Sequence, residues 1–317
     1  MKKFTSVLFV MAMVAAVSIA SAYAGEKKVK VGFTLKTVNN PFVISVKNGA
    51  AQAAEDLGVD IIITDSQMNS QKQMQDIESF IQQRVDVILI DAMDSQAILP
   101  TIDDAVDAGM KIVTEDVRIP DAGEKVLSHI GIDNHAAGAQ LAKWLAAKLK
   151  AAGKRNVIIL AGIPGNEATD SRANGYREVL LNNPDITVLD TRLAGDKREE
   201  GLMVMDDMLQ RFASIDGVIC SNDELALGAI SAINEAGRDK DILVCGFDGN
   251  KYALEAIKSG AMAATIDHAP YSMGYLAIKT CVKVARNQSV DRLTVMDVEI
   301  VEAANVDQII AKHADEE

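Results

Sequence analysis

Aromatic residues and cysteines are scarce in this chain of 317 residues. Aromatic side chains make up 4% of the sequence, with Trp144 as its one tryptophan, and there are three cysteines. An odd number of cysteines excludes a complete disulfide framework, and the lack of a CxxC or Cys/His pattern argues against a metal site. Cys220 and Cys245 each end a short apolar stretch, so we interpret them as buried small residues, while a Cys220–Cys245 disulfide stays open. We expect neither a cofactor nor a metal.

The chain also lacks an excess of positive charge. It has 32 lysines and arginines against 45 aspartates and glutamates, which gives a formal net charge of −13. An acidic chain without basic clusters repels nucleic acid and anionic membranes, so we exclude both as partners. Beyond the N-terminal segment no apolar run reaches the roughly 20 residues that cross a bilayer.

The N-terminal segment has the pattern of a secretory signal. Lys2 and Lys3 precede an apolar run from about Val7 to Ala20, and Ala22-Tyr23-Ala24 supplies the small residues that a signal peptidase accepts. We therefore expect residues 1–24 to be a signal peptide that is cleaved after Ala24, and the mature protein to be exported.

What the sequence does contain is a regular alternation of two patterns. Short, continuously apolar runs rich in Val and Ile are typical of strands buried on both faces of a parallel sheet, and helical spacing fills the segments between them. Val43, Val46, Ala50, Ala53 and Leu57 recur on one face of such a helix, which Gly58 would end. The strand-like runs begin at Val29, Asp60, Asp86, Lys111, Ser128, Asn156, Thr187, Gly217, Ile242 and Ala263.

About ten strands are too many for one sheet of ordinary size, so we divide the chain near Gly131 into two doubly wound α/β lobes. We expect residues 25–131 plus 269–296 to form the N-terminal lobe. Residues 132–268 plus 297–317 would form the C-terminal lobe, because the segments after Ala269 are too few for a third domain.

Polar residues follow most of the predicted strands, at the end where doubly wound sheets bind their ligands. Donors and acceptors in such number suit sugar hydroxyls, each of which donates once and accepts twice. No Ser/His/Asp order or phosphate loop accompanies them, so we expect no enzyme, although two aspartates could resemble a glycosidase pair. The candidates are Lys36, Asn40, Phe42, Asp116, Arg172, Asn222, Asp248 and His268.

The motifs TVNNPF, VTEDV, ATDSRANGYRE, SNDELALGA and GFDG, in this order and spacing, resemble those of the ribose-type periplasmic sugar-binding proteins. The resemblance covers Val29 to Ile300 and implies a type I periplasmic binding protein fold, two lobes joined by a three-segment hinge. Effector domains of lactose-repressor-type regulators share part of this pattern. Such regulators need a helix-turn-helix of roughly 50 residues first, whereas about 35 residues precede TVNNPF here, most of them in the signal.

The resemblance also implies roles for single residues. Asn40 would donate to a ligand hydroxyl, Phe42 would cover one face of the ring, and His268 would occupy a hinge position. Lys36 stands where ribose binders have serine and resembles the allose-binding relatives. The carboxylates of Asp116 and Asp248 would accept hydroxyl protons of the ligand. Arg172 and Asn222 would donate to its oxygens.

Three departures from the family pattern bear on the ligand. Val43 falls where a second aromatic residue is expected, and Val117 falls where ribose binders carry an arginine, with Arg118 one residue further on. Asp196 takes the place of a stacking aromatic residue in the second lobe. Loss of stacking surface favours a ligand recognised mainly through hydrogen bonds, such as a polyol, a cyclitol or an unusual pentose. The roles of Arg118 and Asp196 stay open.

The sequence therefore predicts a monomeric periplasmic solute-binding protein that delivers a monosaccharide, polyol or cyclitol to an ABC transporter permease. The alternative is a protein that presents its ligand to a chemoreceptor or sensor kinase, including capture of a furanone-type signal. Transport and sensing require the same fold and the same closure, so the sequence does not separate them.

Overall fold

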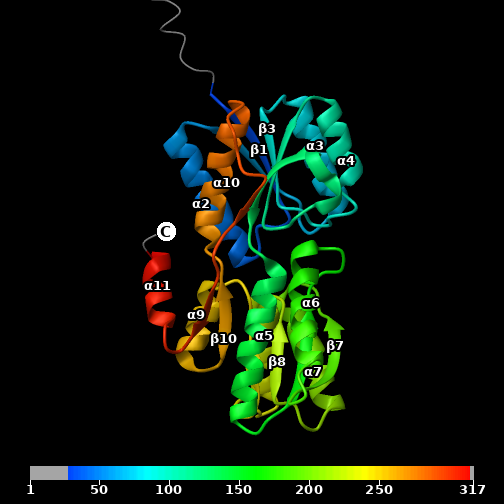
Figure 1. Cartoon of the computed structure of the whole chain (residues 1–317), viewed down its shortest axis with the longest axis vertical. Helices are drawn as coiled ribbons and strands as arrows, with labels where there is room; N and C mark the ends of the chain where they lie inside the picture. Colours follow the sequence, from blue (N-terminus) through cyan, green and yellow to red (C-terminus); the bar gives the residue numbers. More distant parts are fainter. Residues whose placement is uncertain (1–27, 315–317) are drawn as a thin grey trace, which may run out of the picture.

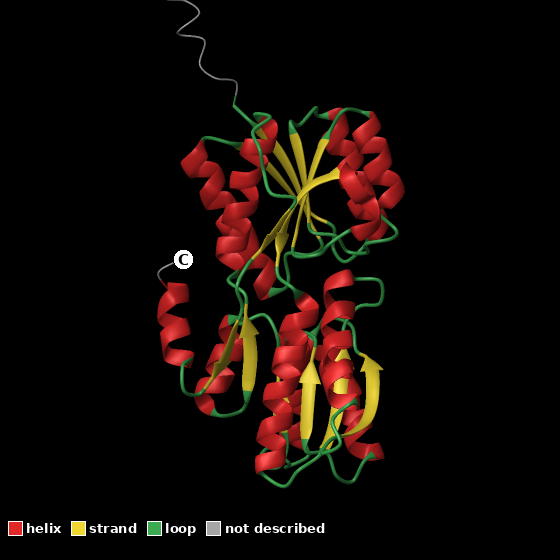
Figure 2. Cartoon of the chain, viewed as in Figure 1, coloured by secondary structure: helices red, strands yellow, loops and turns green. Residues whose placement is uncertain are grey.

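The computed structural model describes residues 28–314, so the predicted signal peptide and its cleavage site lie outside the described residues. Two six-stranded sheets, one above the other in Figures 1 and 2, each carry helices on both faces. No helix within residues 28–314 has the length and apolar character to span a bilayer. The predicted architecture of two α/β lobes is confirmed.

The first sheet has the strand order β11-β5-β4-β3-β1-β2, and all of its pairings are parallel. Helices α2 and α10 cover one of its faces, and α3 and α4 cover the other (Figure 1). The elements of this lobe are β1 (Lys30–Leu35), α2 (Pro41–Leu57), β2 (Asp60–Asp65), α3 (Ser70–Gln82), β3 (Val87–Ile90), α4 (Leu99–Asp107), β4 (Lys111–Glu115), η1 (Pro120–Lys125), β5 (Val126–Gly131), α10 (Pro270–Ala285) and β11 (Leu293–Val295).

The second sheet has the order β12-β10-β9-β8-β6-β7, and its strands are parallel except that β12 runs antiparallel to β10. Its elements are α5 (Asn134–Ala151), β6 (Asn156–Ala161), α6 (Glu167–Leu181), β7 (Thr187–Leu193), α7 (Arg198–Arg211), β8 (Gly217–Cys220), α8 (Asp223–Glu235), β9 (Leu243–Cys245), α9 (Lys251–Ser259), β10 (Ala264–Asp267), β12 (Glu299–Glu302) and α11 (Val306–Ala314).

The chain passes between the two sheets three times, after β5, after β10 and between β11 and β12. Each of the ten predicted strands is present. The segments after Ala269 do return to both sheets, but the separate strands β11 and β12 were not predicted. Both are short and only partly buried, so neither shows the continuous apolar run that marks the inner strands.

The cysteines do not form the disulfide that the sequence left open. Strands β8 and β9 are neighbours, but Cys245 lies opposite Ile219 and not opposite Cys220. Because side chains alternate between the faces of a strand, the two thiols point to opposite faces of the sheet. Both are free and buried, and burial raises the pKa of each thiol above its usual range. They are core residues.

Helix α2 packs closely against α10, and small residues make the approach possible. The predicted buried face is present at Val43, Val46, Ala50 and Ala53, whereas Leu57 in the last turn is 38% exposed. Gly58 ends the helix in the left-handed conformation, as the sequence predicts.

We expect Gly49→Ala to destabilise the protein by at least about 2 kcal/mol, because overpacking forces backbone to move. A Cβ atom at Gly49 would lie 1.9 Å from the carbonyl oxygen of Tyr271 in α10. Urea unfolding measures the change. Ala51→Ser, on the exposed face of the same helix, should change the free energy of unfolding by less than about 0.5 kcal/mol. Equal effects of the two changes would contradict close packing at Gly49.

Candidate functional site

A narrow cavity with a free volume of about 20 Å³ lies between the lobes, at the carboxyl ends of the strands of both sheets. Seven of the eight candidate residues from the sequence line it, and His268 does not. The first lobe contributes Lys36, Asn40, Phe42 and Asp116. The second lobe contributes Asn166, Ala168, Thr169, Arg172, Asp196, Asn222 and Asp248.

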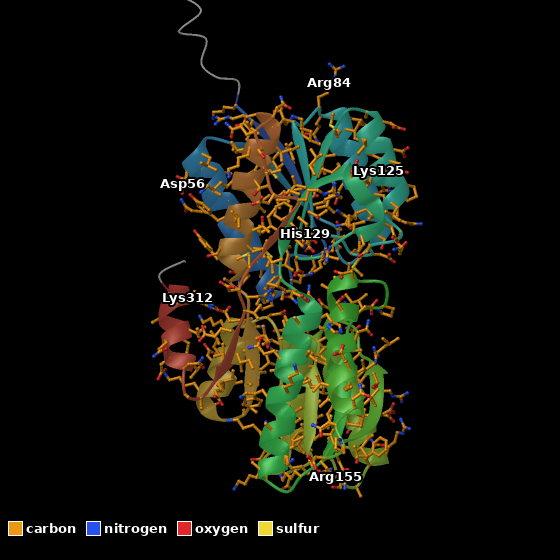
Figure 3. The ribbon with its side chains drawn as sticks, in the orientation of Figure 1. Asp56, Arg84, Lys125, His129, Arg155 and Lys312 are labelled. Carbon is orange, nitrogen blue, oxygen red and sulfur yellow. The ribbon has the colours of Figure 1, made fainter. Side chains whose placement is uncertain are left out.

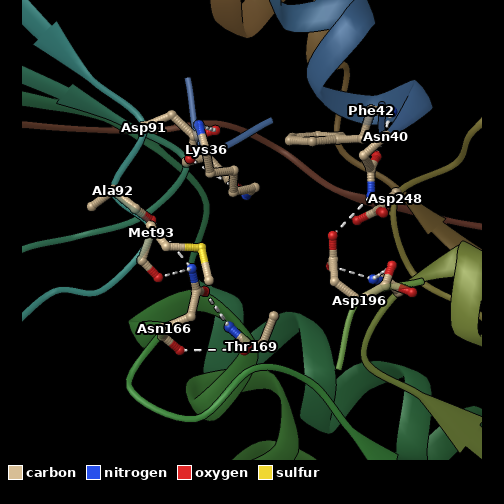
Figure 4. A network of polar contacts seen from close by, with 12 residues as sticks. Lys36, Asn40, Phe42, Asp91, Ala92, Met93, Asn166, Thr169, Asp196 and Asp248 are labelled. Atoms are coloured by element: carbon tan, nitrogen blue, oxygen red, sulfur yellow. Dashed lines mark hydrogen bonds and ion pairs between the residues drawn. The ribbon is translucent and has the colours of Figure 1, made fainter. Parts of the chain in front are cut away.

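Two asparagines in the cavity wall are helix N-caps, and this fixes the direction of their amide groups. The Asn40 Oδ1 accepts from the backbone N–H of Phe42 at 2.9 Å, and the Asn222 Oδ1 accepts from that of Leu225 at 2.8 Å. With the oxygen turned toward the helix, each NH₂ group is directed into the cavity as a donor. Both donate to the carboxylate of Asp196, Asn40 at 3.4 Å (Figure 4) and Asn222 at 2.5 Å.

Asn166 repeats this arrangement and links the lobes. Its Oδ1 caps α6 by accepting from the N–H of Thr169, and its NH₂ donates to the carbonyl oxygens of Ala92 and Met93, each at 3.3 Å (Figure 4). Nearby, the backbone N–H of Ser95 donates to the carbonyl oxygen of Gly165 at 3.1 Å. These contacts join the first lobe to the second, so the structure shows the cleft in a closed arrangement.

Arg172 is the central cation of the site. Its side chain is buried, and the Nε donates to the Asn134 Oδ1 at 2.7 Å, while Nη1 donates to the carbonyl oxygen of Ser221 at 3.0 Å. Ion pairs reach Asp248 in its own lobe at 3.3 Å and Asp116 in the other lobe at 3.6 Å. The guanidinium thus connects both candidate carboxylates across the cleft.

The guanidinium also rests on an aromatic base, since its central carbon lies 3.9 Å from the ring centre of Phe247. That distance is within the range of a cation–π interaction, which strengthens when the pair is desolvated. Phe247 therefore supports one face of the guanidinium by packing, and Asn134 and Ser221 fix its position through hydrogen bonds.

Asp116 and Lys36 form the charged floor of the first lobe. The Lys36 Nζ lies 2.8 Å from the Asp116 Oδ2, and the lysine side chain is almost completely buried. Burial alone would raise the pKa of Asp116, but the charges of Lys36, Arg172 and His268 outweigh it and hold that pKa well below its usual range. Burial likewise opposes the charge of Lys36, yet Asp116, Asp91 and Asp196 raise its pKa. Both groups are ionised at neutral pH.

Asp116 and Asp248 share an uncommon backbone conformation. Their φ angles are +53° and +125°, a region that residues other than glycine rarely occupy. The backbone N–H of Asp116 donates to the carbonyl oxygen of Ile130 at 3.0 Å, and that of Asp248 donates to the carbonyl oxygen of Ile266 at 2.9 Å. Such strain is found where a structure must present a side chain at a functional position.

One wall of the site is aromatic. The ring of Phe42 lies in the cavity and stacks on His268, with 4.5 Å between ring centres and 14° between planes. His268 is completely buried, contacts the edge of Phe247 and places its Nε2 3.5 Å from the Asp248 Oδ1. In this arrangement His268 orients Phe42 and Asp248 from behind, so a direct role in ligand binding stays a prediction.

The residues that depart from the family pattern have distinct positions. Asp196 lines the cavity, whereas Val43 and Val117 are buried in the apolar core of the first lobe. Arg118 is exposed and does not line the cavity. Asp196 is therefore the departure that changes the chemistry of the site.

The sequence analysis missed two acidic residues behind the lysine. Asp91 follows β3, and its Oδ1 lies 3.4 Å from the Lys36 Nζ. Burial and the nearby Asp116 raise the pKa of Asp91 to about 7, although Lys36 lowers it. Burial and both aspartates raise the pKa of Glu115 well above its usual range. Neither carboxyl oxygen of Glu115 accepts a hydrogen bond from a described residue.

The sequence does contain a signal for these two acids. Each stands at the end of a predicted strand, like the candidate residues that were selected for that reason. His129, on strand β5 beside β4, lies within the first lobe, on the side toward the second lobe (Figure 3). The His129 Nδ1 lies 2.9 Å from the Thr114 Oγ1, and burial together with the charge of Arg118 lowers the pKa of His129 to about 4.

The arrangement suits binding of several hydroxyl groups. Carboxylates accept, capped asparagines and cations donate, and one aromatic face is present. Among residues 28–314 no cluster of His, Cys, Asp and Glu has the geometry to hold a metal ion. A wider hollow of about 470 Å³ adjoins the cavity at Asn40 and Asp196, and Lys197, Arg198 and Glu224 contribute to its wall.

Known proteins with similar sequences and structures bind small solutes. The sequence matches the periplasmic binding protein domain over residues 31–289. It is 38% identical over 267 residues to the ribose import binding protein of Bacillus subtilis, which covers 84% of this chain and 85% of that protein.

Two solved structures of solute-binding proteins have a similar fold. An ABC transporter solute-binding protein from Actinobacillus succinogenes with bound D-allose has a TM-score of 0.83 at 30% identity, covering 89% of this chain and 100% of that one. One from Bacillus halodurans with bound myo-inositol has a TM-score of 0.85 at 26% identity, covering 91% and 99%. The fold, the inter-lobe cavity and these matches agree, and the chain belongs to the periplasmic binding protein domain family.

Proposed function

We propose that this protein captures one monosaccharide, polyol or cyclitol between its lobes and delivers it to an ABC transporter permease. The observation that carries the proposal is the closed inter-lobe cavity, whose polar lining comes from both lobes. In this closed arrangement about 20 Å³ of the cavity is free, so the lobes must separate to admit a molecule of monosaccharide size. Allose and myo-inositol, bound by the two similar structures, belong to these ligand classes.

The donors and acceptors of the cavity support recognition mainly through hydrogen bonds. Phe42 offers one aromatic face, while Asp196 stands where the family resemblance implies a second stacking residue. Carboxylates that accept hydroxyl protons make charge-assisted hydrogen bonds, which are about twice as strong as neutral ones. The ligand-binding set that we propose is the eight sequence candidates with Asp196 and Asn166 added.

The charges around Asp116 and Asp248 argue against this pair acting as the two carboxyl groups of a glycosidase. A glycosidase needs one carboxylic acid with a raised pKa beside an ionised partner. Here Lys36 and Arg172 hold the pKa of Asp116 low against the effect of burial, and Asp248 is ion-paired with Arg172. Asp116 and Asp248 are thus suited to accept hydrogen bonds from the ligand.

The remaining sequence predictions enter the proposal unchanged. We place the mature protein in the periplasm as a monomer, with a signal peptide cleaved after Ala24. The lobe limits are residues 25–131 plus 269–296 and residues 132–268 plus 297–317. Presentation of the ligand to a chemoreceptor or sensor kinase stays the alternative prediction.

A thermal-shift screen of pentoses, hexoses, polyols and cyclitols, followed by calorimetry, tests the proposed function. One compound is expected to bind with micromolar affinity or better, which corresponds to about −8 kcal/mol. At 100 times its Kd it should stabilise the protein by about 2.7 kcal/mol. Stabilisation by amino acids or peptides, with none by any polyhydroxylated compound, would reject the proposal.

Closure is tested separately, by X-ray scattering in solution. Polar contacts of Asn40, Asn166 and Arg172 connect the two lobes and hold the cleft closed. Three chain crossings restrict the motion to a hinge. We expect a smaller radius of gyration when the saturating ligand is added. The same radius in both states would contradict a clamp, even if the ligand binds.

A further inference from the structure

The cavity holds more negative charge than positive charge. Three aspartates and two cations line it, and Asp91 adds a fourth carboxylate that contacts Lys36. The two cations are already engaged, Lys36 with Asp116 and Asp91, and Arg172 with Asp248 and Asp116. Since each cation balances one carboxylate, the ionised site keeps a negative excess, and it lies on Asp196, which is half-buried where the cavity meets the wider hollow.

Asp196 is the carboxylate that these cations do not reach. Among the described residues, no lysine, arginine or histidine nitrogen makes an ion pair with it; its partners are the amide groups of Asn40 and Asn222. Those amides cap helices α2 and α8, whose N-termini add partial positive charge. Neutral donors and helix ends offset only part of the negative charge of this half-buried carboxylate.

Two further carboxylate oxygens in the lining are available to a ligand. The Asp116 Oδ1 is buried and accepts no hydrogen bond from a described residue. Both contacts of Asp248 with Arg172 and His268 are made by Oδ1, so its Oδ2 has no partner among the described residues. An acceptor surplus of this kind calls for a donor with several protons.

We propose that the ligand carries a protonated amino group, as an amino sugar, amino polyol or aminocyclitol does, and that this group lies against Asp196 and Asp248. The inference rests on the proposed function and names its ligand class. An ammonium group supplies three donors and the positive charge that the site lacks. The hydroxyl groups of the same ligand would then occupy Asp116, Arg172 and the capped asparagines.

The state of Asp196 without such a ligand agrees with the proposal. Burial raises the pKa of Asp196 to about 6, the charge of Asp248 adds to this, and Lys36 with the two asparagines lowers it only in part. A cation beside the two carboxylates would lower the pKa of Asp196 again and keep its carboxylate ionised at neutral pH.

Matched pairs of compounds test the proposal by calorimetry at pH 7.5. Glucosamine is compared with glucose, galactosamine with galactose, 1-amino-1-deoxysorbitol with sorbitol, and an inosamine with myo-inositol. N-acetylglucosamine serves as a neutral nitrogen control. In at least one pair the amine is expected to bind about 10-fold or more tightly than its hydroxyl parent.

Asp196→Asn should weaken binding of that amine by about 30-fold or more, and binding of the parent by a clearly smaller factor. Asp206→Asn removes the same charge from the exposed face of α7 and is expected to change neither value beyond about 2-fold. A hydroxyl parent that binds as tightly as its amine in every pair, or equal losses for both in Asp196→Asn, would overturn the amine assignment and leave the proposed function standing. Binding of no compound from either series would overturn both.

Discussion

Arg172→Met is expected to weaken ligand binding at least about 100-fold and to lower the free energy of unfolding by about 3 kcal/mol or more. Methionine fills the space over Phe247 but leaves Asp248 without its closest arginine contact and Asp116 without its cation from the second lobe. Removing one partner of a buried ion pair costs about 3–5 kcal/mol, because the remaining charge stays buried. Calorimetry with the ligand from the screen measures the first effect, and urea unfolding the second.

Two companion variants separate charge from geometry. Arg172→Lys keeps the positive charge but cannot reach Asn134, the Ser221 carbonyl and both aspartates at once, so we expect a loss of about 10-fold or more. Arg177→Met changes an arginine on the same helix that donates a hydrogen bond to the Asn174 side chain, and should leave affinity within about 3-fold. If Arg172→Met also stays within about 3-fold, Arg172 does not hold the ligand.

The strands and most of the cavity could be predicted because one physical rule covers them. Strands buried on both faces are continuously apolar, which sets runs such as VILI of β3 apart from the helices. The loops after such strands meet at one edge of each sheet, and this brings residues far apart in sequence, such as Lys36 and Asp116, to 2.8 Å. The family motifs then selected seven residues that do line the cavity.

Properties that depend on register or depth could not be predicted. The separation of Cys220 from Cys245 follows from a one-residue offset between β8 and β9 that no composition reveals. His268 stands at the end of a strand like the other candidates, yet it lies behind Phe42 because the ring of Phe42 stacks over it. Sequence position fixes the loop, and packing decides which side chain reaches the cavity.

For the two acids behind Lys36, the sequence shows their position at strand ends but not their burial. Asp91 and Glu115 end strands in the same way as the candidates, but an aspartate or glutamate in a loop is usually a solvated cap. Only the structure shows that they are buried beside one another and beside Asp116. Their effect on stability is the second large prediction.

Asp91→Asn is expected to raise the free energy of unfolding of the ligand-free protein above that of the wild type at pH 8. The difference between variant and wild type should be at least about 2 kcal/mol larger at pH 8 than at pH 4. Burial and Asp116 raise the pKa of Asp91 in the folded protein from 3.8 to about 7, against the lowering effect of Lys36. Between these values the folded state holds a proton that the unfolded state has lost, so stability falls as the pH rises. Each pKa unit corresponds to about 1.4 kcal/mol, and asparagine removes the loss because it does not titrate.

Urea unfolding of both proteins at intervals from pH 4 to pH 8 measures this difference. Comparing the two curves cancels the contributions of shared groups that do not interact with Asp91. Asp104→Asn, an exposed carboxylate on α4, should give a curve parallel to that of the wild type. Glu115→Gln should diverge from the wild type in the same direction as Asp91→Asn, because burial and both aspartates raise the pKa of Glu115 too.

A constant difference between wild type and Asp91→Asn across this range would mean that Asp91 is solvated in the ligand-free protein. The lobes would then have to separate far enough to admit water to the end of β3, so the same titration also reports how far the cleft opens.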